Sequence, residues 1–337
     1  MEVLSDADVQ ARVTPEMARA AMRAAIVAAY EGRLNAPPRT VVELGDRRLT
    51  LTCGSVDGAW YGYRSYTAPG STDEDQLVVV HDATTGAVTA LAVGAALGPR
   101  RVGAIGAVAL DALAPARPTA VAVLGTGRQA WHQLWAMPER FRSLPVRVHS
   151  PTEAHRQDFA ARAAVELGLR VRPAASVREA VDDANIVVVA TSSGTPVLGP
   201  GDIDAGAYVT TLGPKQVGRS EIRPDLVRDA ALVVTDSPAQ LRSYDPPHVL
   251  AGSPPHGGDG GDDNRGGTGG DSGVGGARGG GDGRDDDGVA GAESGGIVHL
   301  GAVLTGVVPV PDGTRVFLSV GLAGTEAWLL HAAASRR

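Results

Sequence analysis

The chain has 337 residues and a formal net charge of −7, with 38 acidic against 31 basic side chains. This length is enough for two domains of ordinary size. The acidic balance and the lack of any block of lysine and arginine argue against nucleic acid as a partner. The single cysteine excludes an internal disulfide, which favours a cytoplasmic protein in a reducing compartment.

The beginning of the chain and its apolar runs argue against a secreted or membrane protein. The first residues, MEVLSDADVQARVTPEM, are polar and acidic, unlike a secretory signal peptide. No window reaches 18 uninterrupted apolar residues, so we expect no membrane span. Cys53 lies in the apolar run LTLTCG, and we interpret it as a buried strand residue rather than a reactive thiol.

The first third of the chain predicts a helix, several strands and a second helix. Residues 14–31 have Ala, Met and Ile at helical spacing, Thr14 can cap this helix, and Pro15 suits its first turn. The tripeptide TTG is a turn signal between two β-rich runs. The predicted strands fall within 48–56 and 76–93, and the second helix within 97–114.

From residue 119 onward, predicted strands alternate with predicted helices. The strands are near-continuous apolar runs, as expected when helices cover both faces of a parallel sheet. This pattern predicts an α/β fold with a doubly wound parallel sheet of Rossmann type. The predicted strands are 119–125, 146–150, 184–193, 207–213 and 231–237, and the predicted helices begin near 129 and cover 151–168 and 176–184.

Residues 257–288 consist mainly of glycine and aspartate and interrupt this pattern. Such a composition has too little to bury to offset its ordering entropy. We therefore predict a disordered insertion over 252–296. Ordinary globular patterning resumes at 297–306 and 315–334, with a strand and then a C-terminal helix, so the insertion lies within a domain and does not end one.

The stretch VAVLGTGRQAWHQL, residues 121–134, contains the pattern G-x-G-x-x-A at the end of a strand and the start of a helix. Gly125 permits a tight turn, Gly127 lets the backbone approach a pyrophosphate, and Ala130 lets helix and strand pack closely. The helix N-terminus then offers free N–H groups to phosphates. The alternative is a strand–turn–helix without a ligand. The predicted cofactor contacts of this loop are Gly125, Thr126, Gly127, Arg128 and Gln129.

The end of the predicted strand 146–150, the second strand of the Rossmann-type region, bears on the choice between NADP and NAD. An NAD site usually has a carboxylate there for the ribose 2′-hydroxyl, whereas Glu153 comes slightly late. Ser150 and Thr152 can hydrogen-bond a 2′-phosphate, and Arg128 or Arg156 can neutralise it. We therefore expect NADP, with NAD as the alternative. The competing interpretation is that these residues only cap the following helix.

Three hydroxyl residues end the predicted strand 184–193, where a nicotinamide or ribose would lie. They are Thr191, Ser192 and Ser193, and we predict that they contact the cofactor. Glu221 is interpreted as serving the start of a helix. No His, Cys, Asp and Glu set has metal-ligand spacing, so no metal is expected.

Several segments taken together resemble one protein family. They are APPR (36–39), YGYRSY (61–66), HDATTGAVTAL (81–91), RRVGAIGAVA (100–109), VAVLGTGRQA (121–130), ATSSGTPVLG (190–199), VTTLGPKQVGRSEI (209–222), VTDS (234–237) and FLSVGLAGTE (317–326). In this order they are similar to the ornithine cyclodeaminase/μ-crystallin family of NAD(P)-dependent enzymes, which includes cyclodeaminases, alanine dehydrogenases and ketimine reductases. The resemblance covers nearly the whole chain outside the glycine-rich insertion.

The resemblance implies a split architecture. Residues 1–116 with 320–337 would form a substrate-binding and dimerisation domain of α+β type, and 117–319 the Rossmann domain. The active site would lie in the cleft between them, and the protein would be a homodimer. An active site in this position agrees with the tendency of parallel sheets to bind ligands beyond the carboxyl ends of their strands.

Family members hold the substrate carboxylate with basic residues of the first domain. The resemblance places these roles on Arg39, Arg64 and Arg101, with Arg64 standing where the family has a lysine. An arginine can still pair bidentately with a carboxylate, but it cannot shuttle a proton. Without the resemblance, each arginine would be interpreted as a surface or structural ion pair.

The main departure from the family pattern is Lys215, which stands where cyclodeaminases have a catalytic Asp. A lysine cannot pair with a substrate ammonium, but it can donate a proton to an imine or carbonyl. Alternatively, Lys215 is a solvent-facing loop residue. We therefore predict an oxidoreductase that moves a hydride to or from the α-carbon of a small amino acid, imino acid or cyclic ketimine. The alternatives are a cyclodeaminase that releases ammonia and a non-catalytic, crystallin-like binding protein.

Overall fold

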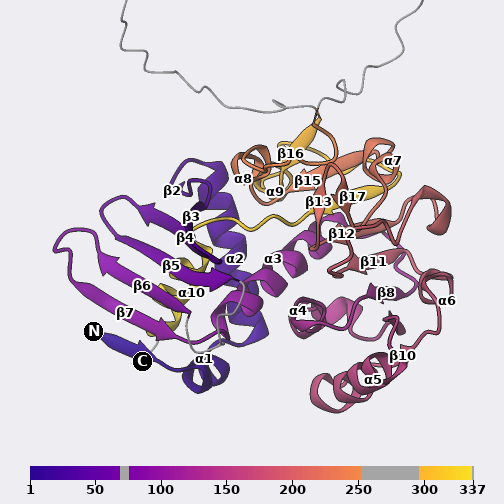
Figure 1. The fold of residues 1–337 in the computed structure, drawn as a ribbon, viewed down its shortest axis with the longest axis horizontal. Helices are drawn as coiled ribbons and strands as arrows, with labels where there is room; N and C mark the ends of the chain where they lie inside the picture. Colours follow the sequence, from indigo (N-terminus) through magenta and orange to yellow (C-terminus); the bar gives the residue numbers. More distant parts are fainter. Residues whose placement is uncertain (69–75, 252–295, 336–337) are drawn as a thin grey trace, which may run out of the picture.

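The computed structural model describes residues 1–68, 76–251 and 296–335. In these residues the chain forms two large β-sheets that lie side by side, each packed against helices (Figure 1). The predicted insertion 252–296 lies outside the described residues except for Gly296. Among the described residues, no helix is both long and apolar enough to span a bilayer.

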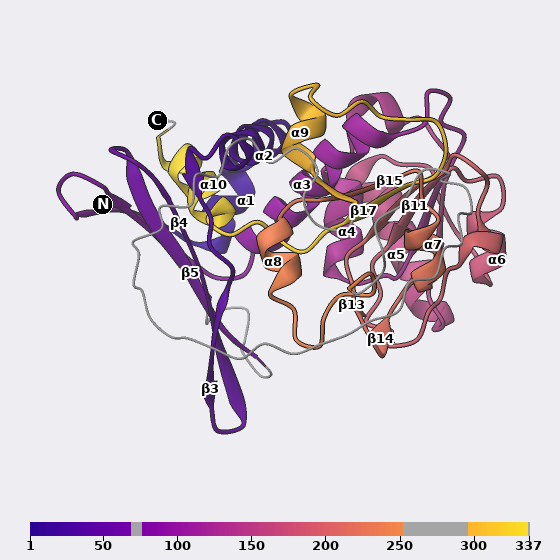
Figure 2. The ribbon, with the colours of Figure 1, turned by 90° about the horizontal axis from the view of Figure 1, so that it is seen from above.

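The first sheet is built from the N-terminal part of the chain. Its strand order is β1-β7-β6-β5-β4-β2, with β3 also paired to β4, and only β1 and β7 pair in parallel. The hairpin of β3 and β4 projects away from the rest of the molecule (Figure 2). The strands are β1 (Glu2–Leu4), β2 (Leu34–Asn35), β3 (Thr40–Leu44), β4 (Arg47–Val56), β5 (Trp60–Ala68), β6 (Leu77–Asp82) and β7 (Val88–Val93).

Four helices accompany this sheet: α1 (Asp6–Arg12), α2 (Pro15–Tyr30), α3 (Leu97–Leu113) and α10 (Thr325–Ala334). Helix α2 begins as predicted, because the Thr14 side chain accepts a hydrogen bond from the Met17 N–H and Pro15 occupies the first turn. Helix α10 packs against β5 and β6 and also contacts α2 and α3. The last helix of the chain therefore completes the core of the first sheet.

The second sheet has eight strands that all pair in parallel, which confirms the predicted Rossmann-type doubly wound sheet. Its order is β10-β9-β8-β11-β12-β17-β15-β16. The chain winds outward in one direction from β8 and in the other from β11, so the switch point lies between these two strands. The strands are β8 (Val121–Leu124), β9 (Val146–His149), β10 (Val171–Pro173), β11 (Ile186–Val189), β12 (Tyr208–Thr211), β15 (Leu232–Thr235), β16 (Ile297–His299) and β17 (Arg315–Leu318).

Helices connect these strands, and the longest of them, α5, ends where the sequence predicts. Gly168, in the left-handed conformation at φ 64°, ends α5. A small antiparallel hairpin, β13 (Lys215–Gln216) with β14 (Arg219–Ser220), follows β12. The helices are α4 (Arg128–Trp135), α5 (Glu153–Leu167), α6 (Val177–Val181), α7 (Pro224–Arg228), α8 (Pro238–Arg242) and α9 (Leu300–Leu304), with 3-10 turns at Glu139–Phe141 and Pro200–Asp202.

The prediction that Cys53 is buried is wrong. Cys53 lies on β4 as expected, but its side chain is exposed. The neighbouring Gly54 faces the core instead, where a Cβ would lie 2.5 Å from the Cα of Gly324. Because successive strand residues point to opposite faces, the close approach at Gly54 turns Cys53 outward. The apolar run identifies the strand but not which face is covered.

Candidate active site

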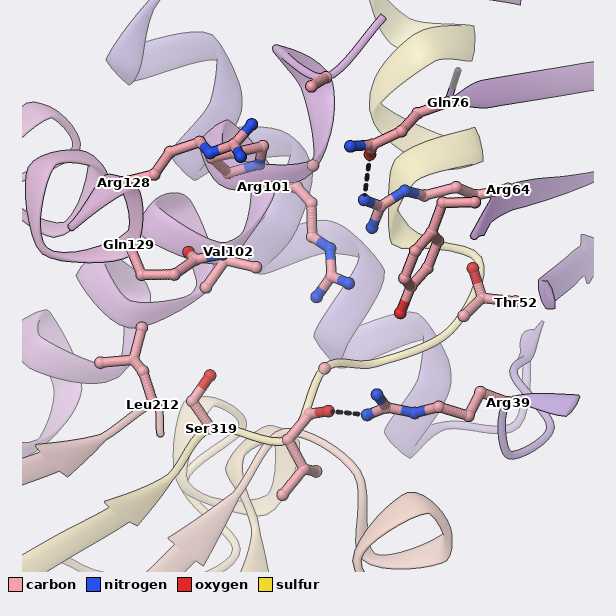
Figure 3. Close-up of a pocket in the computed structure, with 16 residues that line it drawn as sticks. Arg39, Thr52, Arg64, Gln76, Arg101, Val102, Arg128, Gln129, Leu212 and Ser319 are labelled. Carbon is pink, nitrogen blue, oxygen red and sulfur yellow. Dashed lines mark hydrogen bonds between the residues drawn. The ribbon is translucent and has the colours of Figure 1, made fainter. Parts of the chain in front are cut away.

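A pocket of about 340 Å³ lies between the two sheets. The first sheet and its helices contribute Arg39, Arg64 and Arg101 to its wall. The second sheet contributes Gln129, Leu212 and Ser319, which follow the carboxyl ends of β8, β12 and β17 (Figure 3). The structure therefore brings the three arginines predicted to bind a carboxylate into one pocket.

Arg64 of β5 and Arg101 of α3 are held by one buried carboxylate, Glu326 of α10. Arg64 Nη1 donates to Glu326 Oε1 at 2.8 Å, and Arg101 Nε donates to the same oxygen at 2.8 Å. The Glu326 side chain is only 1% exposed. Burial alone would raise the pKa of Glu326, but the charges of Arg101 and Arg64 outweigh it and hold this pKa below its usual value.

Two glycines make room for these guanidinium groups. A Cβ at Gly98 would lie 2.9 Å from Arg64 Nη2, and a Cβ at Gly321 would lie 3.1 Å from Arg101 Nη1. Gly321 also has φ +89°, a conformation that other residues rarely adopt. Arg64 additionally donates to Gln76 Oε1 and lies 4.4 Å from the centre of the Tyr66 ring. The position of both arginines is thus fixed by packing as well as by charge.

Arg39 is anchored separately from the other two arginines. Its Nη2 donates to the carbonyl oxygen of Val320 at 2.7 Å, and its backbone N–H donates to Gln240 Oε1 at 2.9 Å. Within the described part of the chain, Arg39 forms no ion pair with an acidic side chain. Figure 3 shows its guanidinium group beside the segment that follows β17, across the open space from Arg101.

Three buried polar atoms in the pocket wall have no hydrogen-bond partner among the described residues. They are Thr52 Oγ1, Arg101 Nη1 and Gln129 Oε1, and all three residues line the pocket. Unsatisfied buried polar groups are uncommon in folded proteins. In the pocket wall these three atoms are available to a polar ligand.

The glycine loop between β8 and α4 has the geometry that its sequence predicts. Gly125 has φ +110°, and a Cβ there would lie 2.3 Å from the carbonyl oxygen of Ala190, so only glycine fits. Gly127 is the N-cap of α4, and a Cβ there would meet nothing within 4 Å. Gly127 and Arg128 are exposed, so a ligand can reach the start of α4. Thr126, Gly127 and Arg128 also line a second cavity of about 510 Å³, beside α4 and α5.

The residues predicted to select NADP lie where β9 ends. Ser150 directly follows the strand and is buried, while Thr152 is the exposed N-cap of α5. The Thr152 side chain makes no capping hydrogen bond, so the capping interpretation is not supported for this residue. Arg156 Nη1 donates to the carbonyl oxygens of Ser150 and Pro151. Glu153 lies beyond the strand end and pairs with Arg156 at 3.9 Å.

The three hydroxyl residues predicted to contact the cofactor, Thr191, Ser192 and Ser193, follow β11 and differ from one another in their surroundings. Thr191 Oγ1 donates to Glu221 Oε2 at 2.8 Å, and Ser193 Oγ donates to the carbonyl oxygen of Thr195 at 2.6 Å. Ser192 is exposed. None of the three lines the pocket that holds the arginines, so their predicted contact with the cofactor stays a prediction.

The interpretation of Glu221 as a helix-start residue is wrong. Its carboxylate is fully buried and accepts hydrogen bonds from residues at the ends of two neighbouring strands, β11 and β12. These strands end in loops that would otherwise leave buried N–H groups unpaired. The donors are Thr191 N–H and Oγ1 on one oxygen, and Thr211 Oγ1 and Gly213 N–H on the other.

Asp236 makes a similar connection after β15. It is fully buried, and its two carboxylate oxygens accept from the N–H groups of Val320 and Gly321, each at 2.9 Å. Burial raises the pKa of Asp236, although these N–H groups and the charge of Arg101 oppose the shift. Asp236 thereby holds the turn that carries Arg39's carbonyl partner, Val320, and the glycine beside Arg101.

Lys215 is not the solvent-facing loop residue of the alternative interpretation. It is 2% exposed, and its Nζ donates to the carbonyl oxygen of Gly213 at 2.7 Å. Burial lowers the pKa of Lys215 to about 8, although the carboxylates of Glu221 and Asp236 favour its charged form. Lys215 does not line the pocket, although Leu212, three residues earlier in the chain, does.

The carboxylates Glu326, Glu221 and Asp236 were not predicted as site residues. Each belongs to a segment that carries the family resemblance, which was a usable signal. A second signal for Asp236 was an acidic residue directly after the buried strand LVVT. Among the described residues, no group of three or more His, Cys, Asp or Glu side chains is placed to hold a metal ion.

The parallel sheet, the glycine loop at its switch point and the arginine-lined pocket define a Rossmann-type protein with a positively charged pocket between its two sheets. The model of the ornithine cyclodeaminase/mu-crystallin family matches residues 1–331, and the chain belongs to this family.

Known proteins show the same relationship. The ketimine reductase mu-crystallin of Mus musculus is 27% identical over 165 residues, which are 49% of this chain and 51% of that protein. The L-lysine cyclodeaminase of Streptomyces rapamycinicus is 30% identical over 48% of this chain and 47% of its own length. The chain thus spans about half the length of these curated relatives. The Thermococcus litoralis Delta(1)-pyrroline-2-carboxylate reductase structure with NADH and L-proline superposes with a TM-score of 0.77 at 22% identity, covering 99% of this chain and 96% of that one.

Proposed function

We propose that this protein is an NAD(P)-dependent oxidoreductase that transfers a hydride to or from the α-carbon of a small amino acid, imino acid or cyclic ketimine. The observation that carries the proposal is one pocket with arginines of the first sheet on one side and residues of the glycine loop on the other. A carboxylate held by the arginines would lie facing a cofactor held at the glycine loop. The relatives named ketimine reductase and pyrroline-2-carboxylate reductase support this reaction class.

The glycine loop fits a dinucleotide on its own geometry. Gly125 allows the turn, and the open space at Gly127 lets a pyrophosphate approach the N–H groups of α4. We assign the pyrophosphate contacts to Gly125, Thr126 and Gly127, with Arg128 and Gln129 on the side that faces the pocket. When bound, the cofactor would supply or accept the hydride.

We favour NADP over NAD. The end of β9 has no carboxylate to accept the ribose 2′-hydroxyl, and Ser150 and Thr152, which carry hydroxyl groups, follow the strand instead. The free Thr152 hydroxyl at the start of α5 supports a role as a 2′-phosphate ligand, because helix N-termini favour anions. Thr191, Ser192 and Ser193 are proposed to lie along the nicotinamide half.

The protein's own residues account for the remaining steps. The substrate carboxylate is bound and oriented by Arg39, Arg64 and Arg101, and this places the substrate α-carbon against the second sheet. We propose Lys215 as the group that tunes protonation at the reacting nitrogen, since its lowered pKa of about 8 leaves it able to give up a proton near neutrality. Arg64, which stays protonated, contributes charge and geometry rather than proton transfer.

The test is a titration of the purified protein with NADPH and NADH, with and without a cyclic ketimine carboxylate, followed by nicotinamide fluorescence and absorbance. Binding and oxidation of the reduced cofactor would support a reductase and would rank the two cofactors. Binding without oxidation would direct attention to amino-acid oxidation and to ammonia release from ornithine. If neither cofactor binds, the proposal is wrong.

We propose that the two sheets belong to two domains, 1–116 with 320–337 and 117–319. The packing of α10 against the first sheet supports the discontinuous boundary, because it returns the end of the chain to the N-terminal core. Limited proteolysis followed by mass spectrometry tests this division, since cuts in the connections should leave 1–116 associated with the C-terminal fragment.

We also propose that the protein is a cytoplasmic homodimer. The projecting strand β3 exposes apolar side chains, and a second copy could cover them. Val41, Val42 and Leu44 of this strand are 47%, 41% and 50% exposed. Sedimentation should give the mass of two chains, and Val42→Glu should shift it toward one. The cytoplasmic location rests on the single cysteine and is checked by fractionation.

A further inference from the structure

We propose that Tyr66 is a catalytic residue, whose phenol group donates the proton to the reacting nitrogen and accepts it in the oxidative direction. This inference rests on the proposed function and adds a proton donor to the same pocket. Arg39, Arg64 and Arg101 keep their shared role of binding the substrate carboxylate.

Reduction of a C=N bond needs a proton at nitrogen, and its last donor must lie within hydrogen-bond reach of that nitrogen. The family has a lysine at the position of Arg64 and, in its cyclodeaminases, an Asp at the position of Lys215. Arg64 keeps its proton. Lys215 is buried, its Nζ donates to the Gly213 carbonyl oxygen, and it does not line the pocket. The charge of Lys215 can influence protonation, but another group must contact the ligand.

Tyr66 lines the pocket and is partly exposed. In the wall that the structure describes, the other polar side chains are arginines, glutamines, a threonine and a serine. Arginines stay protonated, and amides and aliphatic hydroxyls are very weak acids. A phenol can both give up and regain a proton, and tyrosine serves as a general acid or base in enzymes. Among the described lining residues, Tyr66 is therefore the side chain suited to proton transfer.

The position of Tyr66 places it beside a carboxylate-binding group. Tyr66 follows Arg64 by two residues on β5, so the two side chains point to the same face of the sheet. The guanidinium carbon of Arg64 lies 4.4 Å from the centre of the Tyr66 ring. In an imino acid, one carbon–carbon bond joins the carboxylate to the C=N carbon. A carboxylate bound at Arg64 therefore brings the C=N bond close to Tyr66.

The surroundings of Tyr66 include a second positive group. Burial raises the pKa of Tyr244, the charge of Arg39 opposes this shift, and Tyr66 adds to it. Arg39 and Tyr66 thus both lie within electrostatic range of the Tyr244 hydroxyl. The negative charge that proton donation leaves on the Tyr66 oxygen is then formed near Arg64 and Arg39, rather than beside a carboxylate of the described pocket wall.

The reaction balances with the proposed cofactor and water. In the reductive direction the C=N double bond loses its π component. Its carbon takes a hydride from NAD(P)H, and its nitrogen takes the proton of the Tyr66 hydroxyl as that O–H bond breaks. The phenolate regains a proton from water. The imine is reduced to an amine, and the nicotinamide is oxidised.

The kinetic experiment uses Tyr66→Phe, which keeps the ring beside Arg64 and removes the hydroxyl. The substrate is 1-piperideine-2-carboxylate, a six-membered cyclic ketimine, with the preferred cofactor. We expect kcat to fall about 100-fold, the usual size of general acid catalysis, and KM to change less than about 3-fold. Tyr63→Phe is the matched control, because Tyr63 lies on the same strand but does not line the pocket, and its kcat should stay within about 2-fold of wild type.

Equilibrium binding gives a second readout that needs no turnover. Picolinate and benzoate are planar carboxylates of the same shape, and only picolinate has a ring nitrogen next to the carbon that carries the carboxylate. Calorimetric titration of wild type should show picolinate binding about 5-fold more tightly, the gain of one hydrogen bond from the phenol. In Tyr66→Phe this ratio should fall close to one, with benzoate affinity unchanged. Thermal unfolding verifies that each variant is folded.

The outcomes separate the inference from the proposed function. Tyr66→Phe with the kcat of wild type would overturn the role of Tyr66 and leave the oxidoreductase in place. A picolinate preference that survives in Tyr66→Phe would also overturn it, because another group would then contact the nitrogen. An equal loss of picolinate and benzoate affinity would show that Tyr66 only shapes the carboxylate site. If wild type reduces no imino acid, the oxidoreductase proposal fails, and the picolinate-to-benzoate ratio still decides whether Tyr66 contacts the nitrogen.

Discussion

The pocket's arginine wall (Arg39, Arg64 and Arg101) and the strand-end carboxylates (Glu221 and Asp236) both hold charged side chains away from bulk water, partly for Arg39 and Arg64 and almost completely for the others. They differ in whether every polar atom of the charged group has a hydrogen-bond partner. Glu221 and Asp236 have donors on every carboxylate oxygen. In the wall, Arg101 Nη1 and Glu326 Oε2 have no partner within the described residues.

The hydrogen-bond partners of a buried charged group therefore indicate whether it stabilises the fold or binds a ligand. A carboxylate whose oxygens all accept internal donors holds the backbone in place, as Glu221 does for the ends of β11 and β12. A guanidinium group with a buried, unused N–H group is prepared for a partner from outside. The arginine wall is therefore expected to affect ligand binding, and the strand-end carboxylates stability.

The largest effect should come from removing the charge that holds the wall together. Glu326→Gln leaves the buried Arg101 and the partly buried Arg64 without a counter-ion, and we expect a loss of about 3–5 kcal/mol in the free energy of unfolding. Urea unfolding at pH 7 measures it, with the exposed Glu153→Gln as the control. A loss below about 1 kcal/mol would mean that the wall does not depend on Glu326.

The same variant tests the sign of the pH dependence. The folded-state pKa of Glu326 lies below its usual value of 4.5, so its stabilising contribution is present above pH 4.5 and is lost as the pH falls through the folded pKa. The stability gap between wild type and Glu326→Gln should therefore narrow in acid. A gap that widens below pH 4.5 would contradict this sign.

Next in size is the loss of the ligand-facing charge. Arg101→Ala should lower kcat/KM by about 100-fold or more, because it removes a buried, charge-assisted contact to the substrate carboxylate. Steady-state kinetics with the ketimine carboxylate checks it, and Arg101→Lys should recover only part. Arg48→Ala, on the exposed side of β4, is the control. Unchanged turnover in Arg101→Ala would contradict the proposal that the arginine wall binds the substrate carboxylate.

Glu221→Gln tests the strand-end carboxylates, which we expect to affect stability more than ligand binding. An amide presents one acceptor oxygen and an NH₂ group where four donors now converge, so we expect a loss of about 2–3 kcal/mol in stability. The KM for the carboxylate substrate should change much less than in Arg101→Ala. Thermal and urea unfolding with parallel kinetics tests this. A large change in KM without loss of stability would place Glu221 in ligand binding.

The charge of Lys215 interacts with both regions, with Glu221 and Asp236 and with Arg39, and pH profiles can show which role it has. If its ammonium donates a proton during reduction, kcat/KM for reduction should fall as the pH rises above about 8, where Lys215 loses its proton. Lys215→Arg, which stays protonated, should lack this limb. Initial rates from pH 6 to 10 measure it. An identical profile in the variant would make Lys215 structural.

The smallest effect concerns the cofactor. Thr152→Glu places a carboxylate at the start of α5, where it would repel a 2′-phosphate. We expect NADPH affinity to fall about 10-fold, with NADH affinity changed less than about 3-fold. Fluorescence titration of both cofactors measures it. An equal loss for both would show that Thr152 does not face the 2′ position.

The sequence alone determined the class of fold. Periodic apolar runs, capping residues such as Thr14 and the glycine pattern at Gly125 act locally, so strands, helices and the glycine loop could be predicted from neighbouring residues. The three arginines could be selected only because the family pattern marks them. The aromatic strand β5 carries Arg64 and was not predicted as a strand, because nothing local shows which neighbours it pairs with.

Only the tertiary structure decided which charges meet. Glu326 is separated by more than 200 residues from both arginines that it holds. Glu221 joins two strands, and Gly54 turns Cys53 outward because Gly324 packs against it. The free energy of a buried charge depends on the dielectric and the donors around it, and those are set by chain segments far away in sequence. For that reason Lys215 could be located from sequence, but its burial and its lowered pKa could not.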